Sequence, residues 1–460
     1  MILIEPDMQL TPEQVGMIVM RHVSSEMPKL SKYRKYFDGE QAIMGKTYND
    51  STKPCNRIVT NYCDNIVNNY NGYLTGLPVS YNSQDNIDDI QEVLKYNDAA
   101  AKDGAFLRSS LIYGKSYELH YVDEYGKPRF DLIDTREGIP VYANTITRDI
   151  LYFIRFYPRS TLDSNDGFIV EVYDGEYQER YYCGSEFTGL ILQSREPHHY
   201  GQVPVIVLPL NDDEYPIFYK IMGLQDAYNT LLSGEVDDFE AFCDAYLALT
   251  GMEVDEENVQ AMKENRVLVI PEGGDAKYIT KSVSDTQIQN MLQNINDTIH
   301  KIANSPDFSQ ESFGVSSGIA LRFRLLGFEN AASAIASNFK KALQKRIELI
   351  CTILGITGSD DVWRDVDIII DRNIPVNETE AANMVNTLRG LVSDKTLLTQ
   401  LPFIADADAE MEAVKAQKAE NMELYSFGGE EAEMNGETQR TVLGGEDIHT
   451  TANNGRQDVD

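Results

Sequence analysis

The sequence is constrained most by two long amphipathic segments that bracket a short insert. Apolar residues recur on one helical face over 218–249, and a second apolar stripe follows a capping signal formed by Ser284 and Gln287. The insert, 250–283, predicts a short helix followed by the strands RVLVIP and AKYITK. We therefore expect an antiparallel helix pair, 218–249 and 284–305, that carries a small α/β module at its tip.

A polar break interrupts the helical pattern after this pair. The stretch SPDFSQESFGVSSG places two phenylalanines among serines and acids, and it is longer than an ordinary helix–helix connection. We expect a loop at 306–317 and then a helix from 318 to about 354, with Gly327 as the site of a kink. The strand VDIIID follows, so that 318–375 is a long kinked helix and a strand.

The remaining segments are helical ends around a central sheet region. Residues 1–50 predict a helical arm, in which Thr11 opens a helix through a capping box. Within 51–217, NRIVTNYCDNIVNNYNGYLTG predicts a helix, and the β-branched and aromatic runs after it predict an antiparallel sheet. Two helices are expected over 376–420, and the Gly-rich acidic tail, 421–460, is expected to be disordered. The chain is thus expected to be a multi-domain α+β protein.

Charge and composition exclude several classes of protein. The 460 residues include 40 Lys and Arg against 73 Asp and Glu, a formal charge of −33. Such a chain is unsuited to coating nucleic acid, which requires clustered cations. We expect no signal peptide and no membrane span, since no apolar run approaches the roughly 20 residues that a span needs. The five cysteines form no CxxC pair, so neither a zinc site nor a disulfide framework is indicated and a reduced intracellular compartment is expected.

One stretch partly matches a phosphate-binding loop. In SSLIYGKS, residues 109–116, Gly114, Lys115 and Ser116 fit the pattern, but Ser109 stands where the first glycine is needed. The residues LIY suit a strand better than a phosphate cradle. We therefore favour a β-strand that contains one glycine over a nucleotide site.

Two carboxylate clusters and a histidine pair are the other chemical candidates. Acids at the end of a strand can hold Mg²⁺, but adjacent acids are more often a solvated turn, and no partner histidine or lysine stands near them in the sequence. The histidine pair has no second pair of ligands and favours a surface loop. The residues concerned are Asp212, Asp213, Glu214, Asp365, Asp367, Asp371, His198 and His199.

The order of segments resembles that of portal (connector) proteins of tailed bacteriophages, in particular the family of long-tailed phages of Gram-positive bacteria. The stretch SPDFSQESFGVSSGIALRFRLLGFEN is the most specific match. Others occur in family order from about 50 to 420, namely NRIVTNYCDNIVNNYNGYLTGLPVSY, LIYGKSYELHYVDEYGKPRF, VPVIVLPLNDDE, GLQDAYNTLLSGEVDDFEAFCDAYLALTG and RNIPVNETEAANMVNTLRGLVSDKTLLTQLPFIADADAEME.

The resemblance implies a ring, generally of twelve subunits, that passes the phage genome through one capsid vertex without bond chemistry. It implies no catalytic residue, cofactor or metal. The implied partners are double-stranded DNA in transit, the terminase motor, a head-completion adaptor, and the major capsid and scaffolding proteins, with no membrane involved. The protein would be part of the virion and would be assembled in the host cytoplasm.

The resemblance also assigns a part of the ring to each segment. The wing would be 51–217, the stem helices 218–249 and 284–305, the clip 250–283, the tunnel loop 306–317 and the crown 376–420. Residues expected to face DNA in the tunnel loop are Asp307, Phe308, Ser309, Gln310, Glu311, Ser312 and Phe313. Stem acids expected to line the channel, where negative charge would weaken adhesion to DNA, are Glu235, Asp237, Asp238 and Asp244.

Three alternatives stay open on the sequence alone. The chain could be a metal-dependent nucleic-acid enzyme that uses the carboxylate clusters. It could instead be a scaffolding protein of the capsid that forms no portal. The break at 306–317 could also be an ordinary surface connection.

Overall fold

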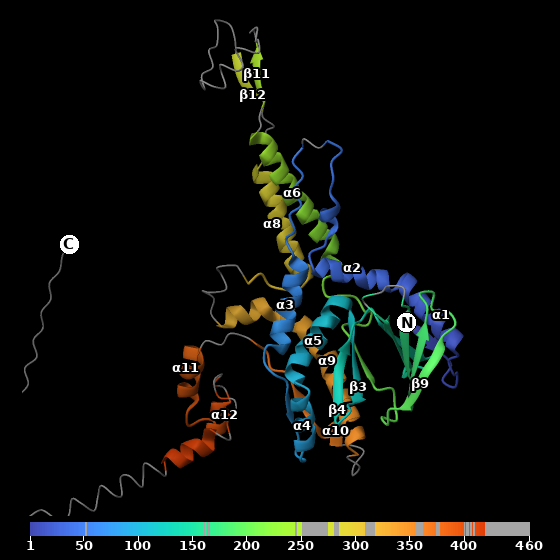
Figure 1. Cartoon of the computed structure of the whole chain (residues 1–460). Coiled ribbons are helices and arrows are strands. Elements are labelled where there is room, and N and C mark those ends of the chain that lie inside the picture. Colours follow the sequence, from blue (N-terminus) through green and yellow to red (C-terminus); the bar gives the residue numbers. More distant parts are fainter. Residues whose placement is uncertain are drawn as a thin grey trace, which may run out of the picture. The chain divides into compact units, whose positions relative to one another are not determined.

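The computed structural model describes residues 1–418 except for 51–52, 161, 163–165, 244–245, 251–274, 280–284, 309–317, 356–361, 374–377, 400, 402–403, 405–406 and 408–409. The chain divides into two compact units, Met1–Ile374 and Pro375–Asp460. Figure 1 shows the elements of both units along the chain.

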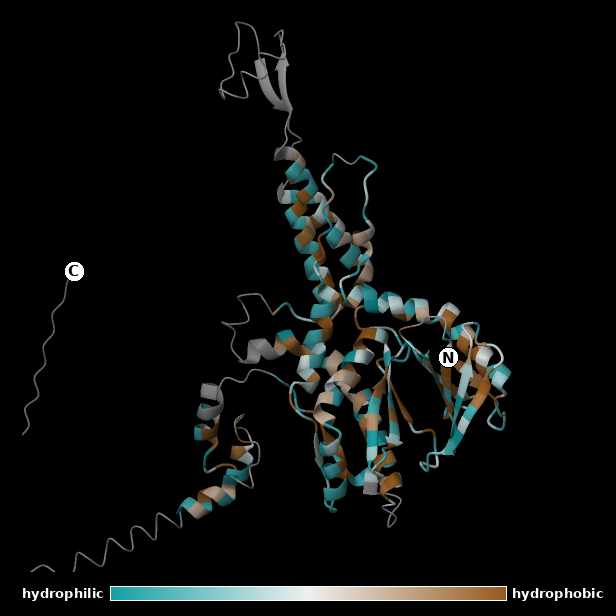
Figure 2. Cartoon of the chain, in the orientation of Figure 1, coloured by the Kyte–Doolittle hydropathy of each residue, from teal (hydrophilic) through white to brown (hydrophobic). Residues whose placement is uncertain are grey.

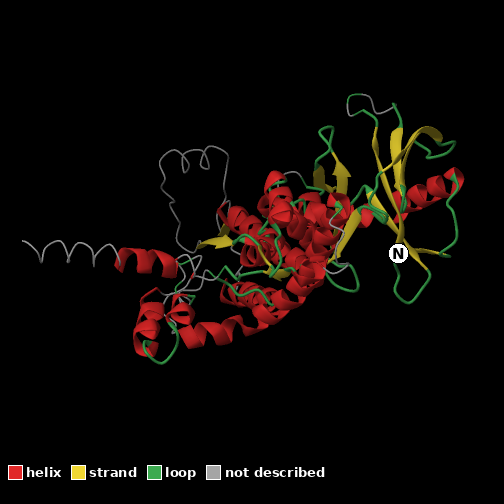
Figure 3. Ribbon diagram, turned by 90° about the horizontal axis from the view of Figure 1, so that it is seen from below, coloured by secondary structure: helices red, strands yellow, loops and turns green. Residues whose placement is uncertain are grey.

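A six-stranded sheet lies to one side of the central helices of the first unit (Figure 3). Its order is β1-β5-β6-β7-β8-β9, and only β1 pairs in parallel. Its strands are β1 (Ile2–Ile4), β5 (Gly138–Ala143), β6 (Ile150–Pro158), β7 (Phe168–Tyr173), β8 (Tyr177–Cys183) and β9 (Ile191–Pro197).

Helix α1 (Pro12–Ser25) packs its apolar face on this sheet, where Val15 and Val19 are buried in the same cluster as Ile154. The predicted capping box is confirmed, because the Thr11 hydroxyl accepts from Gln14 N and the Gln14 side chain accepts from Thr11 N.

A three-stranded antiparallel sheet, order β10-β3-β4, forms the second layer of strands. Its strands are β3 (Lys115–Val122), β4 (Pro128–Ile133) and β10 (Val205–Pro209). It packs against helices α5 (Ala99–Tyr113) and α9 (Gly318–Leu354). The predicted antiparallel sheet region is therefore confirmed, and so is the long helix over 318–354.

The phosphate-loop candidate of 109–116 is neither a phosphate loop nor the strand that we favoured. Residues up to Tyr113 belong to α5, Gly114 closes that helix in the left-handed region (φ 86°), and β3 begins at Lys115. A phosphate loop requires strand, loop and helix in that order, whereas this chain runs from helix to strand. Lys115 instead pairs with Glu214 at 2.6 Å, and the Ser116 hydroxyl donates to Phe106 O at 2.9 Å.

We expect Gly114→Ala to destabilise the first unit by at least about 2 kcal/mol, because the residue must hold a positive φ in a crowded place. A Cβ atom there would lie 2.0 Å from the carbonyl oxygen of Glu214. Thermal unfolding of the two proteins measures this, with Gly175→Ala as the control, since no atom lies within 4 Å of a Cβ at Gly175. Equal melting temperatures of Gly114→Ala and Gly175→Ala would contradict the requirement for glycine at position 114.

The core of the first unit lies where α3 (Tyr62–Thr75), α5 and α9 meet, and α4 (Asp88–Tyr96) covers α5 and α9. Aromatic side chains such as Tyr70, Phe106 and Phe339 are fully buried there. The other elements of this unit are α2 (Met27–Phe37), η1 (Ala42–Gly45), β2 (Ser80–Asn82), η2 (Tyr219–Ile221), α10 (Val362–Asp365) and β13 (Asp367–Ile369). Strand β13 confirms the predicted strand VDIIID and pairs with β2.

Two long helices, α6 (Met222–Cys243) and α8 (Asp285–Ile302), pack as an antiparallel pair (Figure 1). Figure 2 shows hydrophilic and hydrophobic residues interspersed along both helices, as the amphipathic patterns predicted. The α6 helix ends earlier than predicted, at Cys243 rather than 249. Residues Tyr246–Thr250 form β11, which pairs in antiparallel register with β12 (Asp275–Ile279).

This error has a simple cause. A short, mostly apolar run such as YLALT fits a helix face and a strand equally well, and only the pairing partner decides between them. The predicted strand AKYITK is largely confirmed by β12, whereas RVLVIP lies outside the described residues.

The second unit contains α11 (Glu378–Leu388), α12 (Asp394–Leu398) and a helical stretch at 410–418. The helices predicted for this region are confirmed in kind, but the second is split, because α12 ends at Leu398. Ser393 caps the start of α12, since its hydroxyl accepts from Thr396 N. The predicted disordered tail, 421–460, lies outside the described residues.

Candidate functional site at the root of the helix pair

A ladder of buried polar side chains runs along α6. Gln225, Asn229 and Ser233 are fully buried, and Asp237 is 6% exposed. These residues are spaced four apart, and their side-chain oxygens accept hydrogen bonds from backbone N–H groups spaced two apart. The acceptor and donor pairs are Gln225 with Tyr62 (3.0 Å), Asn229 with Thr60 (2.9 Å), Ser233 with Ile58 (2.9 Å) and Asp237 with Asn56 (2.6 Å).

The two spacings match because of elementary geometry. Four residues of an α-helix rise about 6.0 Å, and two residues of an extended chain advance about 6.6–6.8 Å. Each polar side chain of α6 therefore meets a backbone N–H group of the extended segment 56–62, and these hydrogen bonds hold that segment along α6. Spacing of polar residues by four within an apolar helix face is the sequence signal that could have found this ladder.

Asp237 is not on an exposed acidic face, and the prediction that it lines a channel is wrong in this respect. Its carboxylate lies 2.5 Å from Lys46 Nζ and accepts hydrogen bonds from Tyr48 and Asn56. Burial alone would raise the pKa of Asp237, but these donors outweigh burial and lower the pKa below 3.8. Glu235 and Asp238 are half-buried, and Asp244 lies outside the described residues.

We expect Asp237→Ala to release the segment around Asn56 from α6. Loss of the acceptor leaves buried donors unpaired, which costs about 1–3 kcal/mol and would accelerate local hydrogen exchange by roughly 5- to 150-fold. The folded state binds a proton on Asp237 less readily than the unfolded state. Its contribution is therefore present above about pH 4 and is lost as the pH falls through the lowered pKa. Hydrogen exchange of a peptide spanning Asn56 and Ile58 measures the effect, with Glu235→Ala as the control; equal exchange in both variants would contradict it.

The root of the predicted tunnel loop is fixed by the end of α8. Asn304 adopts a positive φ of 49°, Ser305 N donates to His300 O at 3.1 Å, and Asn304 N donates to Lys301 O at 3.4 Å. This pattern is a Schellman motif, which ends a helix sharply, with asparagine in the position that usually holds glycine. His300 Nδ1 also donates to Ser305 O at 2.8 Å. The chain therefore leaves α8 in one defined direction.

Helix α3 holds this turn from the other side. The Tyr70 hydroxyl lies 3.0 Å from Ala303 O and 3.3 Å from Asn304 O, and Asn69 Nδ2 donates to the Ser305 hydroxyl at 3.2 Å. Tyr70 and Ser305 are fully buried. The turn is thus clamped between two helices.

Phe308 lies just beyond the turn and contacts α9. Its ring packs edge-on against Phe328 at 6.2 Å, and the rings of Tyr70 and Tyr73 lie 4.6 Å and 4.7 Å from Phe328. The side chain is 49% exposed, so one face remains open. The rest of the predicted tunnel-loop site, Ser309, Gln310, Glu311, Ser312 and Phe313, lies outside the described residues.

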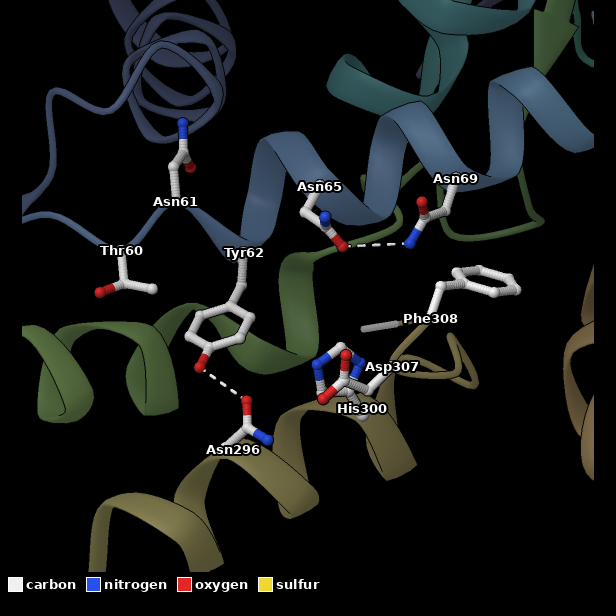
Figure 4. A pocket seen from close by; sticks show the side chains of 9 residues that line it. All are labelled: Thr60, Asn61, Tyr62, Asn65, Asn69, Asn296, His300, Asp307 and Phe308. Atoms are coloured by element: carbon white, nitrogen blue, oxygen red, sulfur yellow. Dashed lines mark hydrogen bonds between the residues drawn. The ribbon is translucent and has the colours of Figure 1, made fainter. Parts of the chain in front are cut away.

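A polar pocket of about 350 Å³ opens beside this root. Figure 4 shows side chains that converge on it from α3, α8 and the segment after α8. Within it, the Tyr62 hydroxyl donates to Asn296 Oδ1 at 2.7 Å, and Asn69 Nδ2 donates to Asn65 Oδ1 at 3.0 Å. Seven of its nine lining residues carry amide, hydroxyl or imidazole groups, and the other two are Asp307 and Phe308. The lining residues are Thr60, Asn61, Tyr62, Asn65, Asn69, Asn296, His300, Asp307 and Phe308.

The structure does not bring the other chemical candidates together. Asp212 and Asp213 lie exposed in a turn after β10, and His199 is exposed at a positive φ of 64°. Asp367 pairs with Lys340 at 2.8 Å, and both side chains are largely exposed. Across the part of the chain that the structure describes, no three His, Cys, Asp or Glu side chains are placed to hold a metal ion.

A buried charge network, which the sequence analysis did not predict, links α9 to the sheet. Arg346 is fully buried and binds Glu118 on β3 through two hydrogen bonds of 2.9 and 2.7 Å. It also binds Asp103 on α5 at 2.5 Å, and its guanidinium lies 4.6 Å from the Phe130 ring centre. Burial raises the pKa of Glu118, but Arg346 and His120 outweigh burial, so the pKa is lowered and the pair is ionic. Arg346 and Glu118 are 228 residues apart, so their pairing leaves no local pattern in the sequence.

Comparison with known proteins identifies the family. Residues 18–424 match the family described as phage portal protein, SPP1 Gp6-like. The chain belongs to this portal protein family.

Individual portal proteins have low sequence identity to this chain, but the alignments extend over most of its length. The portal protein of Bacillus phage SPP1 is 23% identical over 443 residues, which cover 88% of this chain and 84% of the relative. The portal protein of Clostridium phage phiCD119 is 21% identical over 382 residues, which cover 77% and 83% of the two chains.

Two solved necks of GTA particles also align with this portal protein. The neck of the native particle, computed with C12 symmetry, gives a TM-score of 0.43 at 13% identity and covers 74% of this chain and 89% of its own. The neck of the empty particle, computed with C6 symmetry, gives a TM-score of 0.44 at 12% identity. This alignment covers 74% of this chain and 88% of the neck chain.

Family membership confirms the resemblance and the α+β portal fold read from the sequence. It makes the protein a structural component of the phage particle, at the connection between head and tail. In the described part of the portal protein, no helix is both long and apolar enough to cross a bilayer.

Proposed function

We propose that this portal protein assembles into a closed ring, of twelve subunits, at one capsid vertex. Double-stranded DNA passes through the ring during packaging and ejection, while the terminase motor and a head-completion adaptor dock on it. The ring joins the major capsid and scaffolding proteins during assembly in the host cytoplasm. The observation that carries the proposal is the match to portal proteins over 18–424, nearly the whole chain. The protein itself performs no bond chemistry, and ATP hydrolysis belongs to the motor.

The loop after α8 is the part of the ring that meets DNA in this proposal. Asp307, Gln310 and Glu311 face DNA or neighbouring loops, and Phe308 and Phe313 anchor the loop. The clamped turn at Asn304 and Ser305 supports this role, because a loop can press on DNA only from a fixed base. In the stem, Glu235 and Asp238 line the channel, while Asp237 binds Lys46 and Asn56 of its own subunit.

Two variants of the loop test this assignment in an assembly and packaging assay. Deleting 307–313 is expected to leave rings intact and to impair packaging or retention of DNA. Replacing the same residues by a Gly/Ser sequence of equal length separates loss of the side chains from loss of length. Normal packaging by both variants would contradict the loop assignment.

The alternatives have less support. A metal-dependent nucleic-acid enzyme would need ligands brought together, but Asp212 and Asp213 lie in an exposed turn, and Asp367 lies on β13 and pairs with Lys340. A scaffolding protein would not require the loop root that α3, α8 and α9 build.

A further inference from the structure

Two large apolar side chains on the helix pair are exposed to solvent. Phe239 on α6 is 68% exposed, and Met291 on α8 is 45% exposed. The two helices already pack on each other, and the exposed parts of both side chains lie outside that packing. Two exposed apolar side chains on one helix pair offer apolar surface that contact with another subunit can bury.

The two side chains lie at nearly the same level along the helix pair. The ring of Tyr62 on α3 contacts Tyr228 of α6 at 5.3 Å and His300 of α8 at 5.8 Å, which sets these two residues at one level. Phe239 lies eleven residues, about 16 Å, from Tyr228, and Met291 lies nine residues, about 14 Å, from His300. Because the helices are antiparallel, both displacements point away from the end of the helix pair that contacts α3, which is the root of the pair.

The same spacings place the two side chains on opposite faces. Eleven residues are about three helical turns, so Phe239 lies on the side of α6 that carries Tyr228, toward α3. Nine residues are about two and a half turns, so Met291 lies on the side of α8 opposite His300, away from α3. A closed ring relates its subunits by rotation without translation along the axis, so contacts between helix pairs that run along this axis need two different faces at one level. The helix pair meets both conditions.

Charge also favours contact between unlike faces. Glu235 lies one helical turn from Phe239, whereas exposed neighbours of Met291 along α8 include the uncharged Gln287 and Asn294. Packing Phe239 against its own copy would bring acids together, while packing it against Met291 lets amides meet carboxylates.

From this geometry, and resting on the proposed ring, we propose that Phe239 of one subunit packs on Met291 of the next. The partner of this surface is a second copy of the chain in head-to-tail contact. The repeat of this contact closes the stem of the ring around the channel.

Cross-linking of the full chain tests the contact. In a background with Cys55→Ser and Cys243→Ser, the single variants Phe239→Cys and Met291→Cys are treated with a short bismaleimide, alone and mixed. The mixture is expected to give a dimer that neither variant gives alone, and the double variant a ladder of oligomers. Ile302→Cys mixed with Phe239→Cys is the control, because Ile302 is also exposed but lies at the root, and its mixture is expected to give no dimer.

Electron microscopy of the same samples distinguishes failure of this contact from failure of the proposed ring. Rings without the mixed cross-link would overturn this contact and leave the proposed function standing. Cross-links of Phe239→Cys with itself would overturn it in favour of a two-fold contact. Monomers alone would contradict both the contact and the proposed ring.

Discussion

Replacing Arg346 by alanine is expected to lower the free energy of unfolding of the first unit by about 3–5 kcal/mol, because it leaves two buried carboxylates without their cation. Arg346 and Glu118 are both fully buried, and Asp103 is 2% exposed, so water cannot take the place of the guanidinium. The change also removes the ion pairs that tie α9 to β3 and to α5. Urea titration followed by the change in circular dichroism measures the loss.

Lys340→Ala is the matched control, because Lys340 lies on the same helix and pairs with Asp367. That pair is exposed, with 47% and 65% of the two side chains accessible, so its loss is expected to cost about 0–1 kcal/mol. A loss at Arg346 as small as that at Lys340 would show that the network does not hold α9 to the sheet.

Replacing Tyr70 by alanine is expected to cost about 3–5 kcal/mol and to free the root of the loop after α8. The ring is fully buried against Phe328, and its hydroxyl holds the turn at Ala303 and Asn304. Loss of the ring leaves a cavity between α3 and α9, at the point where the chain leaves α8. Thermal unfolding measures the stability, and hydrogen exchange over 300–308 measures the release of the turn.

Tyr70→Phe separates the two contributions of this side chain. It keeps the ring and removes only the hydroxyl, so we expect a loss of about 0.5–1.5 kcal/mol. Faster exchange is expected at the turn while the rest of the first unit stays protected. Unchanged exchange over 300–308 in both variants would contradict the role of α3 as a clamp.

The elements read correctly from the sequence are those whose signals are local. The capping box at Thr11 and the long helical run over 318–354 depend on residues close together, and both are confirmed. Alternating β-branched and aromatic residues predicted the sheet region for the same reason. The short run YLALT was misassigned because its pairing partner, Asp275–Ile279, lies beyond the reach of a periodicity argument.

The candidate site was only partly accessible to sequence reasoning. The loop after α8 stood out as an unusually long polar break, but the residues that hold its root, Asn69 and Tyr70, lie more than 230 positions earlier in the chain. Asp237 was read as a solvated acid, because its partners Lys46 and Asn56 are brought to it only by the fold. Burial of a charge becomes visible only when its distant partner is known.

We propose above all that the chain closes into a ring around a channel. Electron microscopy of the purified full-length protein tests it directly. The account predicts closed, twelve-fold symmetric rings with a central hole. A uniform population of monomers or of open assemblies without a hole would contradict it.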